Sequence, residues 1–335
     1  MRTVVQFCFL LILCSCSMTV VKPEKINGVS FVASRDSITE QHITPVLNIN
    51  ANYAAIMPFG FIRNMDEPRI MHNTKRQWYG ETRAGAGQYI DELRKKNIKT
   101  MLKPQLWVGR GIFTGYIEMD SEEKWQELEA SYSEFILEYA DLAERKNVPM
   151  LCIGTELEKF IENRPAYWTK LITKIKEIYK GKLTYAANWD EFKRTPFWDQ
   201  LDFIGIDAYF PVSDSQTPSV EECKTGWQEH KELIRALSEN YKKPVLFTEF
   251  GYRSVDYTGK EPWKSDRSMH QVNHDAQMNT TKALFEEFWH EKWFSGGFIW
   301  KWFHNYERSG GLDNSQFTPQ NKPVEAIIKS YFQRF

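Results

Sequence analysis

Two glutamates stand at the ends of apolar runs that are typical of buried strands. Glu156 directly follows the run Met150–Thr155, and Glu249 lies near the end of the run Val245–Phe250. They are 93 residues apart, which equals three strand–helix units of about 31 residues. Two carboxyl groups that face each other across a cleft can cleave a glycosidic bond. One must be protonated, to give its proton to the leaving oxygen, and the other must be ionised, to attack the anomeric carbon.

Eight short apolar runs alternate with helical patterns and predict the elements that position these glutamates. The runs are Val29–Ala33, Ala54–Pro58, Lys99–Trp107, Met150–Thr155, Leu183–Asn188, Phe203–Tyr209, Val245–Phe250 and Gly297–Trp302. Between the third and fourth runs, apolar residues recur every three or four positions from Trp125 to Leu142, which predicts an amphipathic helix. Eight such units over about 300 residues predict an α/β protein with one (β/α)8 barrel domain, whose chemistry takes place at the carboxyl ends of the strands.

Aromatic residues at the predicted strand ends could complete a sugar-binding site. Tyr209 ends the sixth run and neighbours the seventh strand in barrel order, so it could donate a hydrogen bond to Glu249; packing at the barrel rim is its alternative role. Four of the 12 tryptophans also fall at strand ends. They are Trp107 on strand three, Trp189 after strand five, and Trp300 and Trp302 on strand eight, where alternation predicts that both indoles point to the same side.

Five segments together carry a resemblance to a known family. They are Gly154-Thr155-Glu156-Leu157, Tyr185-Ala186-Ala187-Asn188-Trp189-Asp190, Phe203-Ile204-Gly205-Ile206-Asp207-Ala208-Tyr209-Phe210-Pro211, Phe247-Thr248-Glu249-Phe250-Gly251-Tyr252-Arg253-Ser254 and Trp300-Lys301-Trp302. In this order they resemble glycoside hydrolase family 113, a family of β-mannanases in the large clan of retaining (β/α)8-barrel glycosidases. The likeness extends from about Gly28 to the end of the chain.

The resemblance implies roles for individual residues. Glu156 would be the general acid/base, Glu249 the nucleophile and Tyr209 the partner of the nucleophile, with the two carboxyl groups about 5–5.5 Å apart, as in retaining glycosidases. The candidate substrate-binding residues are Lys103, Gln105, Trp107, Thr155, Asn188, Trp189, Tyr252, Trp300 and Trp302. The expected reaction is endo-acting hydrolysis of a β-1,4-mannan, with no metal or organic cofactor.

Two positions depart from the pattern that the resemblance leads us to expect. Thr155 stands where the wider clan usually has an asparagine that touches the 2-hydroxyl of the sugar, and Gln105 stands where we expect a histidine. Both positions lie close to the reacting sugar. A β-glucan or another β-hexosan is therefore an alternative substrate, and a surface lipoprotein that binds glycans without cleaving them is an alternative of another class.

The N-terminus has the pattern of an export signal. Arg2 precedes an apolar run from Val4 to Leu13, too short to span a bilayer, and the run ends in Leu13-Cys14-Ser15-Cys16. This ending resembles a bacterial lipoprotein signal with the lipid on Cys16, although a plain secretory peptide that is cut nearby is the alternative. We expect residues 1–16 to be the signal, 17–25 a tether and 26–335 the barrel of an exported protein, anchored to a bacterial membrane at the outer membrane or cell surface.

Composition excludes several other classes. The 335 residues carry 43 Lys and Arg against 44 Asp and Glu, a net charge of −1, which argues against a nucleic-acid partner. Only Cys152 and Cys223 follow the signal, so a bridge between them stays open, although a buried thiol is expected at Cys152. His270 and His274 have zinc-ligand spacing, but Gln271 replaces the glutamate of that motif, so no metal site is predicted. We expect a monomer that binds a neutral polysaccharide or oligosaccharide.

Overall fold

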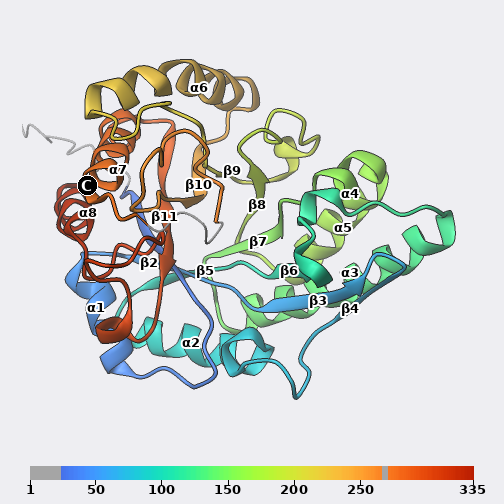
Figure 1. Cartoon of the computed structure of the whole chain (residues 1–335). Coiled ribbons are helices and arrows are strands. Elements are labelled where there is room, and N and C mark those ends of the chain that lie inside the picture. Colours follow the sequence, from blue (N-terminus) through green and yellow to red (C-terminus); the bar gives the residue numbers. More distant parts are fainter. Residues whose placement is uncertain (1–23, 266–270) are drawn as a thin grey trace, which may run out of the picture.

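Eight parallel strands close into a barrel in the computed structural model of the protein, in which residues 24–265 and 271–335 are described (Figure 1). The barrel strands are β1 (Ile26–Phe31), β2 (Tyr53–Ile56), β5 (Lys99–Leu102), β7 (Met150–Thr155), β8 (Lys182–Asn188), β9 (Ile204–Asp207), β10 (Val245–Phe250) and β11 (Phe294–Trp302). Their order around the barrel is β1-β11-β10-β9-β8-β7-β5-β2. The predicted (β/α)8 fold is confirmed, and each strand overlaps one of the eight apolar runs.

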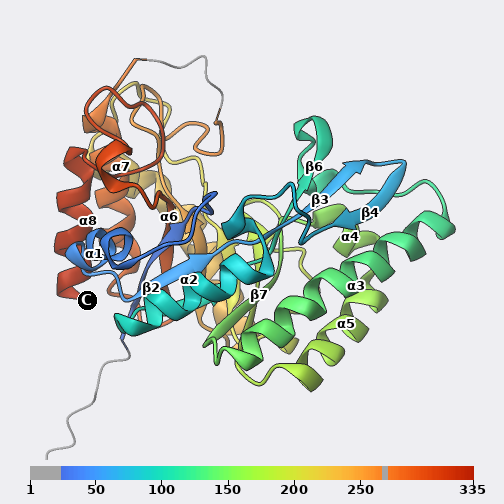
Figure 2. The same cartoon turned by 90° about the horizontal axis from the view of Figure 1, so that it is seen from below.

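Helices follow the strands and cover the outside of the barrel (Figures 1 and 2). They are α1 (Glu40–Asn48), α2 (Arg83–Lys95), α3 (Glu122–Arg145), α4 (Glu158–Asn163), α5 (Pro165–Ile178), α6 (Val220–Tyr241), α7 (His274–Phe288) and α8 (Pro323–Arg334). Single 3₁₀ turns lie at Tyr79–Glu81, Gly109–Gly111, Thr114–Tyr116, Trp198–Gln200 and Tyr306–Arg308. The predicted apolar stripe from Trp125 to Leu142 is the buried face of α3, whose first turn is capped by the Ser121 hydroxyl.

The third predicted strand, Lys99–Trp107, is wrong as one element. Its first part is β5 of the barrel, and its second part is β6 (Gln105–Val108), which belongs to a separate side sheet with β3 (Phe59–Asn64) and β4 (Glu67–Met71) in the order β4-β3-β6. Pro104 separates the two parts, because proline has no N–H for the ladder and restricts the backbone of Lys103 before it. Trp107 therefore does not lie at the end of a barrel strand.

The apolar core has two parts. A small cluster fills the barrel interior and contains Ile26, Ala55, Met101, Met150, Cys152, Ala186, Leu246 and Phe298. A larger cluster lies between the barrel and its helices. Gly28 is required beside the interior cluster, since a Cβ at this position would lie 2.4 Å from the ring of Phe298. This filled interior leaves the carboxyl ends of the strands as the place for a binding cleft.

Cys152 and Cys223 are both buried free thiols, so no bridge joins them. Among residues 24–265 and 271–335, no helix has the length and the hydropathy needed to cross a bilayer.

Candidate active site

A cleft of about 580 Å³ opens at the carboxyl ends of the barrel strands. Five of its lining residues lie at or next to the ends of β7, β8, β9, β10 and β11. They are Glu156, Asn188, Tyr209, Glu249 and Trp300. The remaining lining residues are Phe113, Tyr116, Glu158, Trp189, Asp190, Trp263, Ser265 and Phe317. The fold thus brings both predicted glutamates into one cleft, although they are far apart in the sequence.

Glu249 is held by three hydrogen-bond donors. Its Oε1 accepts from Lys103 Nζ at 2.6 Å and from Gln105 Nε2 at 3.0 Å, and its Oε2 accepts from the Tyr209 hydroxyl at 2.8 Å. The predicted bond between Tyr209 and Glu249 is therefore present. Burial raises the pKa of Tyr209 well above its ordinary value, so the phenol keeps the proton that it donates. An ionised carboxylate is an acceptor only, and this set of donors matches it.

Lys103 is fully buried next to Glu249. Its Nζ contacts Glu249 Oε1 and also Asp207 Oδ1 at 3.1 Å, while the Thr248 hydroxyl donates to the same Asp207 oxygen at 2.7 Å. Burial by itself lowers the pKa of Lys103, but the charges of Asp207 and Glu249 outweigh it and raise the pKa. Lys103 therefore stays charged. It contacts Glu249 inside the protein and is not among the residues that line the cleft, so the predicted contact of Lys103 with the substrate is not seen.

Asp207 is a buried carboxyl group for which no role was predicted. Burial and the charge of Glu249 raise its pKa to about 7, although Lys103 acts in the opposite direction. The sequence did contain a signal for it, because Asp207 ends the otherwise apolar run Ile204–Asp207. A carboxyl group that is buried in such a strand needs a charged or hydrogen-bonding partner. Asp207, Lys103 and Glu249 form one buried charge network.

Glu156 has a different environment. It lies at φ 50°, in the left-handed region, and its backbone N–H donates to the Ala186 carbonyl of β8 at 2.8 Å. Burial raises the pKa of its carboxyl group well above the ordinary value, and the charges of Asp207 and Glu249 raise it further. A left-handed conformation at a non-glycine residue costs on the order of 1–3 kcal/mol and tends to occur at functional sites. At Glu156 it directs the chain from the end of β7 into α4.

A buried hydrogen-bond chain fixes the turn that carries Glu156. The backbone N–H of Leu157 donates to the Tyr185 hydroxyl at 2.6 Å, and this hydroxyl donates to Glu191 Oε1 at 2.7 Å. Glu191 Oε2 accepts from the backbone N–H of Asn188 at 3.0 Å. Burial raises the pKa of Glu191 to about 8. The chain joins the loops after β7 and β8, and the sequence offered no signal for it beyond a carboxyl residue close to Asn188.

The two tryptophans of β11 do not point to the same side as predicted. Trp300 lines the cleft, whereas Trp302 is fully buried in the core between barrel and helices. The reason lies in the pairing of β11 with β1, whose register shifts between Val29–Ile299 and Phe31–Trp302 and so interrupts the simple alternation. Trp302 is therefore a packing residue, and only Trp300 of this pair can contact a ligand in the cleft.

Trp189 lines the cleft as predicted and has an aromatic neighbour that the sequence did not indicate. Its indole stacks on Trp263 with ring centroids 5.0 Å apart and an angle of 17°. Phe113 and Tyr116, which form an edge-to-face pair, contribute a second aromatic group to the lining. Trp263 comes from the long connection between β10 and α7, where no periodic pattern reveals its direction.

The other predicted contacts divide into three groups. Asn188 lines the cleft, and its Oδ1 accepts from the Trp189 backbone N–H at 2.9 Å. Thr155 is half-buried at the last position of β7, directly before Glu156. Tyr252 and Trp107 do not line the cleft: Tyr252 is buried in the core between barrel and helices, two residues beyond the end of β10, and Trp107 is on the side sheet. The predicted cleft contact of Tyr252 is thus wrong.

Glu158 also lines the cleft, but an arginine pairs with its carboxylate. It is the first residue of α4, and it forms an ion pair with Arg194. This pairing distinguishes Glu158 from Glu156, whose pKa is raised by burial and then by the charges of Asp207 and Glu249.

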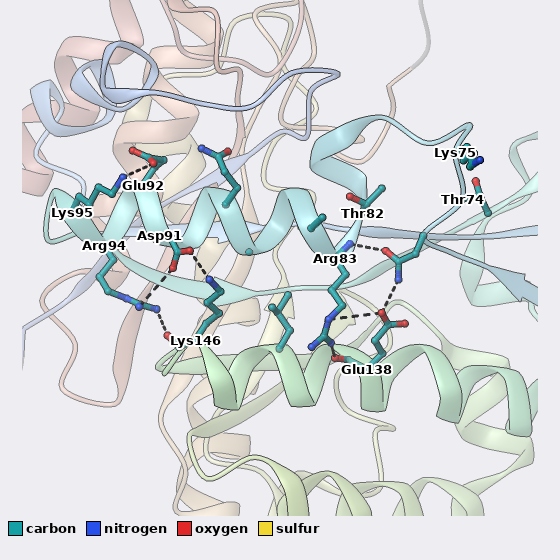
Figure 3. A pocket seen from close by; sticks show the side chains of 15 residues that line it. Thr74, Lys75, Thr82, Arg83, Asp91, Glu92, Arg94, Lys95, Glu138 and Lys146 are labelled. Atoms are coloured by element: carbon teal, nitrogen blue, oxygen red, sulfur yellow. Dashed lines mark hydrogen bonds and ion pairs between the residues drawn. The ribbon is translucent and has the colours of Figure 1, made fainter.

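A second hollow, of about 1170 Å³, lies between α2 and α3 on the outside of the barrel (Figure 3). Its charged side chains pair with one another: Lys95 with Glu92, and both Arg94 and Lys146 with Asp91 (Figure 3). The charges are therefore largely compensated within the groove. In the described part of the chain, no group of three or more His, Cys, Asp or Glu residues is placed to hold a metal ion. Cys16 and His270 lie outside the described residues.

Comparisons with known proteins identify the family of the chain. The model of Glycoside Hydrolase Family 113 matches residues 33–322. The chain is similar in structure to a family 113 β-mannanase from Alicyclobacillus acidocaldarius, with a TM-score of 0.80 and 23% identity over 93% of this chain and 98% of the other. It is also similar to a second family 113 β-1,4-mannanase, with a TM-score of 0.81 and 22% identity over 93% of this chain and 100% of the other.

More distant structures share the barrel. A β-glucuronidase from Faecalibacterium prausnitzii has a TM-score of 0.61 and 14% identity, and the match covers 94% of this chain and 49% of that enzyme. No curated protein is similar enough in sequence to count as a relative. At these identities the solved structures show the fold, while the family model covers most of the chain. The chain therefore belongs to glycoside hydrolase family 113, and it is a glycoside hydrolase.

Proposed function

We propose that the protein is a retaining, endo-acting β-1,4-mannanase in which Glu249 is the nucleophile and Glu156 the general acid/base. The observation that carries this proposal is the contrast between two carboxyl groups in one cleft. Glu249 is held by Lys103, Gln105 and Tyr209, which suits the charged form, whereas the pKa of Glu156 is raised well above its ordinary value by burial and by neighbouring negative charges. A glycosidase needs one carboxyl group in each state.

In the first step, the ionised Glu249 attacks the anomeric carbon, and the bond from that carbon to the leaving oxygen breaks. Glu156 gives its proton to this oxygen, so the shortened chain leaves as a neutral alcohol. Tyr209 and Lys103 hold Glu249 in place, and the attacking oxygen becomes part of an ester to the sugar. The charge of Glu249 is then lost, which lowers the pKa of Glu156 because one of its negative neighbours is neutral.

In the second step, Glu156 is ionised and accepts a proton from a water molecule that attacks the anomeric carbon. The ester bond to Glu249 breaks, its carboxylate is restored, and the sugar is released with the anomeric configuration that it had in the substrate. The same group thus serves as acid and then as base, and the change in the charge of Glu249 drives the change in its protonation.

The lining of the cleft and the similar structures support an uncharged β-mannan as the substrate. Trp300 and the stacked pair Trp189 and Trp263 offer apolar faces to sugar rings, while Asn188 supplies polar atoms. A near-neutral protein suits an uncharged polysaccharide. The two family 113 structures described above are β-mannanases, which favours mannan over other β-hexosans.

The test is a screen of the purified protein against mannan, glucomannan, xylan, chitosan and β-glucan, with reducing ends as the readout. We expect cleavage of mannan and its loss in Glu249→Ala. Glu158→Gln is the matched control, because it removes a carboxylate of the same cleft that is paired with Arg194, and it should keep most of the activity. Unchanged mannan hydrolysis by Glu249→Ala would contradict the mechanism, and an inverted anomer seen first by proton NMR would contradict retention.

We also propose that the protein is exported and anchored through a lipid on Cys16. The support is the sequence pattern of residues 1–16 and the position of the first barrel strand, which starts at Ile26 and leaves a short tether after Cys16. Expression in a bacterial host with labelled palmitate should label the wild type and not Cys16→Ser. Equal labelling of the two proteins, or cleavage at another residue in the mass spectrum of the mature protein, would refute the anchor.

A further inference from the structure

One face of the side sheet carries a row of aromatic residues. Strands β3 and β6 are parallel neighbours, with Phe59 opposite Gln105 and Phe61 opposite Trp107. Because side chains alternate along a strand, these four residues lie on the same face. Phe59 and Phe61 contact each other with ring centroids 6.3 Å apart, and the Trp107 side chain is 55% exposed. We call Phe59, Phe61 and Trp107 the aromatic strip.

The other face of the side sheet is apolar and packs into the main core. Ile62, Ile70, Leu106 and Val108 are buried in the main core. A Cβ at Gly60 would meet Ile70, Leu106 and Phe135 of α3, which shows how closely this face packs on that helix. Figure 2 shows the side sheet lying along α3, away from α7 and α8. One face of the side sheet thus packs on α3. The aromatic strip lies on the opposite face and takes no part in that packing.

The strip is continuous with the active site through Gln105. Its Nε2 donates to the nucleophile Glu249, and Trp107 is two residues further along the same face of β6, a step of about 6.6 Å along the strand. In the barrel order, β2 and β5, which lead into β3 and β6, lie opposite β9 and β10. The strip and the stacked pair Trp189 and Trp263 therefore approach the catalytic glutamates from different sides.

We propose that the aromatic strip binds the distal sugars of a β-linked hexosan chain whose reacting unit lies in the cleft. This inference rests on the proposed function and adds a binding surface outside the cleft. An extended chain that leaves Glu249 past Gln105 meets Trp107 and Phe61, which lie opposite each other on neighbouring strands, and their ring faces can stack on the C–H faces of the distal sugars. The continuity with the cleft favours a polysaccharide over a protein partner, because the occupant must be thin enough to pass Gln105 and reach the carboxylates.

The test compares substrates of different length. Trp107→Ala should lower the ratio of kcat/KM for mannohexaose to kcat/KM for mannotriose by about tenfold, the effect of losing one well-formed stacking contact. Trp107→Phe, which keeps a ring, should retain most of the ratio. Leu233→Ala removes a similarly exposed apolar side chain from α6 and should leave the ratio at the wild-type value. Because Trp107 is half exposed, its replacement should not prevent folding.

Binding measurements separate this inference from the proposed function. Calorimetric titration of mannohexaose into Glu249→Ala should give a Kd that rises about tenfold when Trp107→Ala is added. If the wild type does not cleave mannan, the mannanase assignment fails, and this titration still tests the strip. The strip proposal is overturned if Trp107→Ala changes neither the length ratio nor the Kd for the hexaose.

Discussion

Lys103 is the residue whose removal should change the active site most informatively. It is fully buried between two carboxylates, with Nζ 3.1 Å from Asp207 Oδ1 and 2.6 Å from Glu249 Oε1. At an effective dielectric constant of about 20, an ion pair at 3.1 Å has a Coulomb energy of about 5 kcal/mol. Part of this is offset by the cost of burying Lys103 itself. We expect Lys103→Met to lower the free energy of unfolding by about 3–5 kcal/mol at pH 8, as for other broken buried ion pairs.

The loss of stability in Lys103→Met should depend on pH. In the wild type the pKa of Asp207 is raised to about 7, so the folded state binds a proton more tightly than the unfolded chain. The contribution of Asp207 to the free energy of unfolding is fully present below its pKa in the unfolded chain, near 4. This contribution is lost as the pH rises through its pKa in the folded protein, about 7. Without Lys103 this loss becomes larger, because two carboxylates must ionise in one buried site. Lys103→Met should therefore be closer to the wild type at pH 5 than at pH 8.

Lys103→Met should also lower the activity, and Asp207→Asn should partly reverse its effects. Loss of the charged donor to Glu249 Oε1 should reduce kcat/KM of Lys103→Met at neutral pH by at least about tenfold. Adding Asp207→Asn removes one of the two charges and should restore about 1–3 kcal/mol of stability and part of the activity. The matched control is Lys322→Met, a buried lysine that bonds to the Ser254 hydroxyl and the Gln316 carbonyl and should show no coupling to Asp207.

Chemical denaturation at the two pH values and steady-state kinetics measure these quantities. The reasoning is refuted if Lys103→Met loses the same stability at pH 5 and pH 8 and Asp207→Asn brings no recovery.

Three further results are expected. Tyr209→Phe removes a hydrogen bond to charged Glu249, worth about 1.5–3 kcal/mol, and should lower kcat/KM roughly 10- to 100-fold; an unchanged rate would show that the bond has no catalytic effect. The pH profile of kcat/KM should fall on its basic side as Glu156, whose pKa is raised, loses its proton, and Glu156→Ala should abolish this limb; a limb that persists contradicts its role as acid. The pKa of Glu191 is raised to about 8, so stability should fall as the pH rises from about 5 to 8 by up to about 1.4 kcal/mol per unit. Denaturation of Glu191→Gln should give a shallower fall, and an equal slope would count against this origin.

Much of the site could be predicted because, in a parallel barrel, a residue at the carboxyl end of a strand lies at the same rim as the other strand ends. Glu156, Asn188 and Glu249 end or follow apolar runs, and the carboxyl ends of all barrel strands meet at one rim. A strand end is visible in the sequence, so the apolar pattern alone assigns these three residues to one cleft. The same argument failed for Trp302 and Tyr252, because a register shift or a turn beyond the strand changes the direction of a side chain without changing the apolar pattern.

The sequence alone determined the barrel, the two glutamates and the neighbour that donates to one of them, because strand periodicity and family motifs are local in the chain. The tertiary structure decided what surrounds each glutamate. Lys103, Asp207 and Glu249 come from three different strands or strand ends, so their shared charge network exists only after the barrel closes. The turn of Glu156 is likewise fixed by Tyr185 on another strand. The protonation state of each glutamate depends on burial and on nearby charge, which are set by the tertiary structure and not by the order of residues in the sequence.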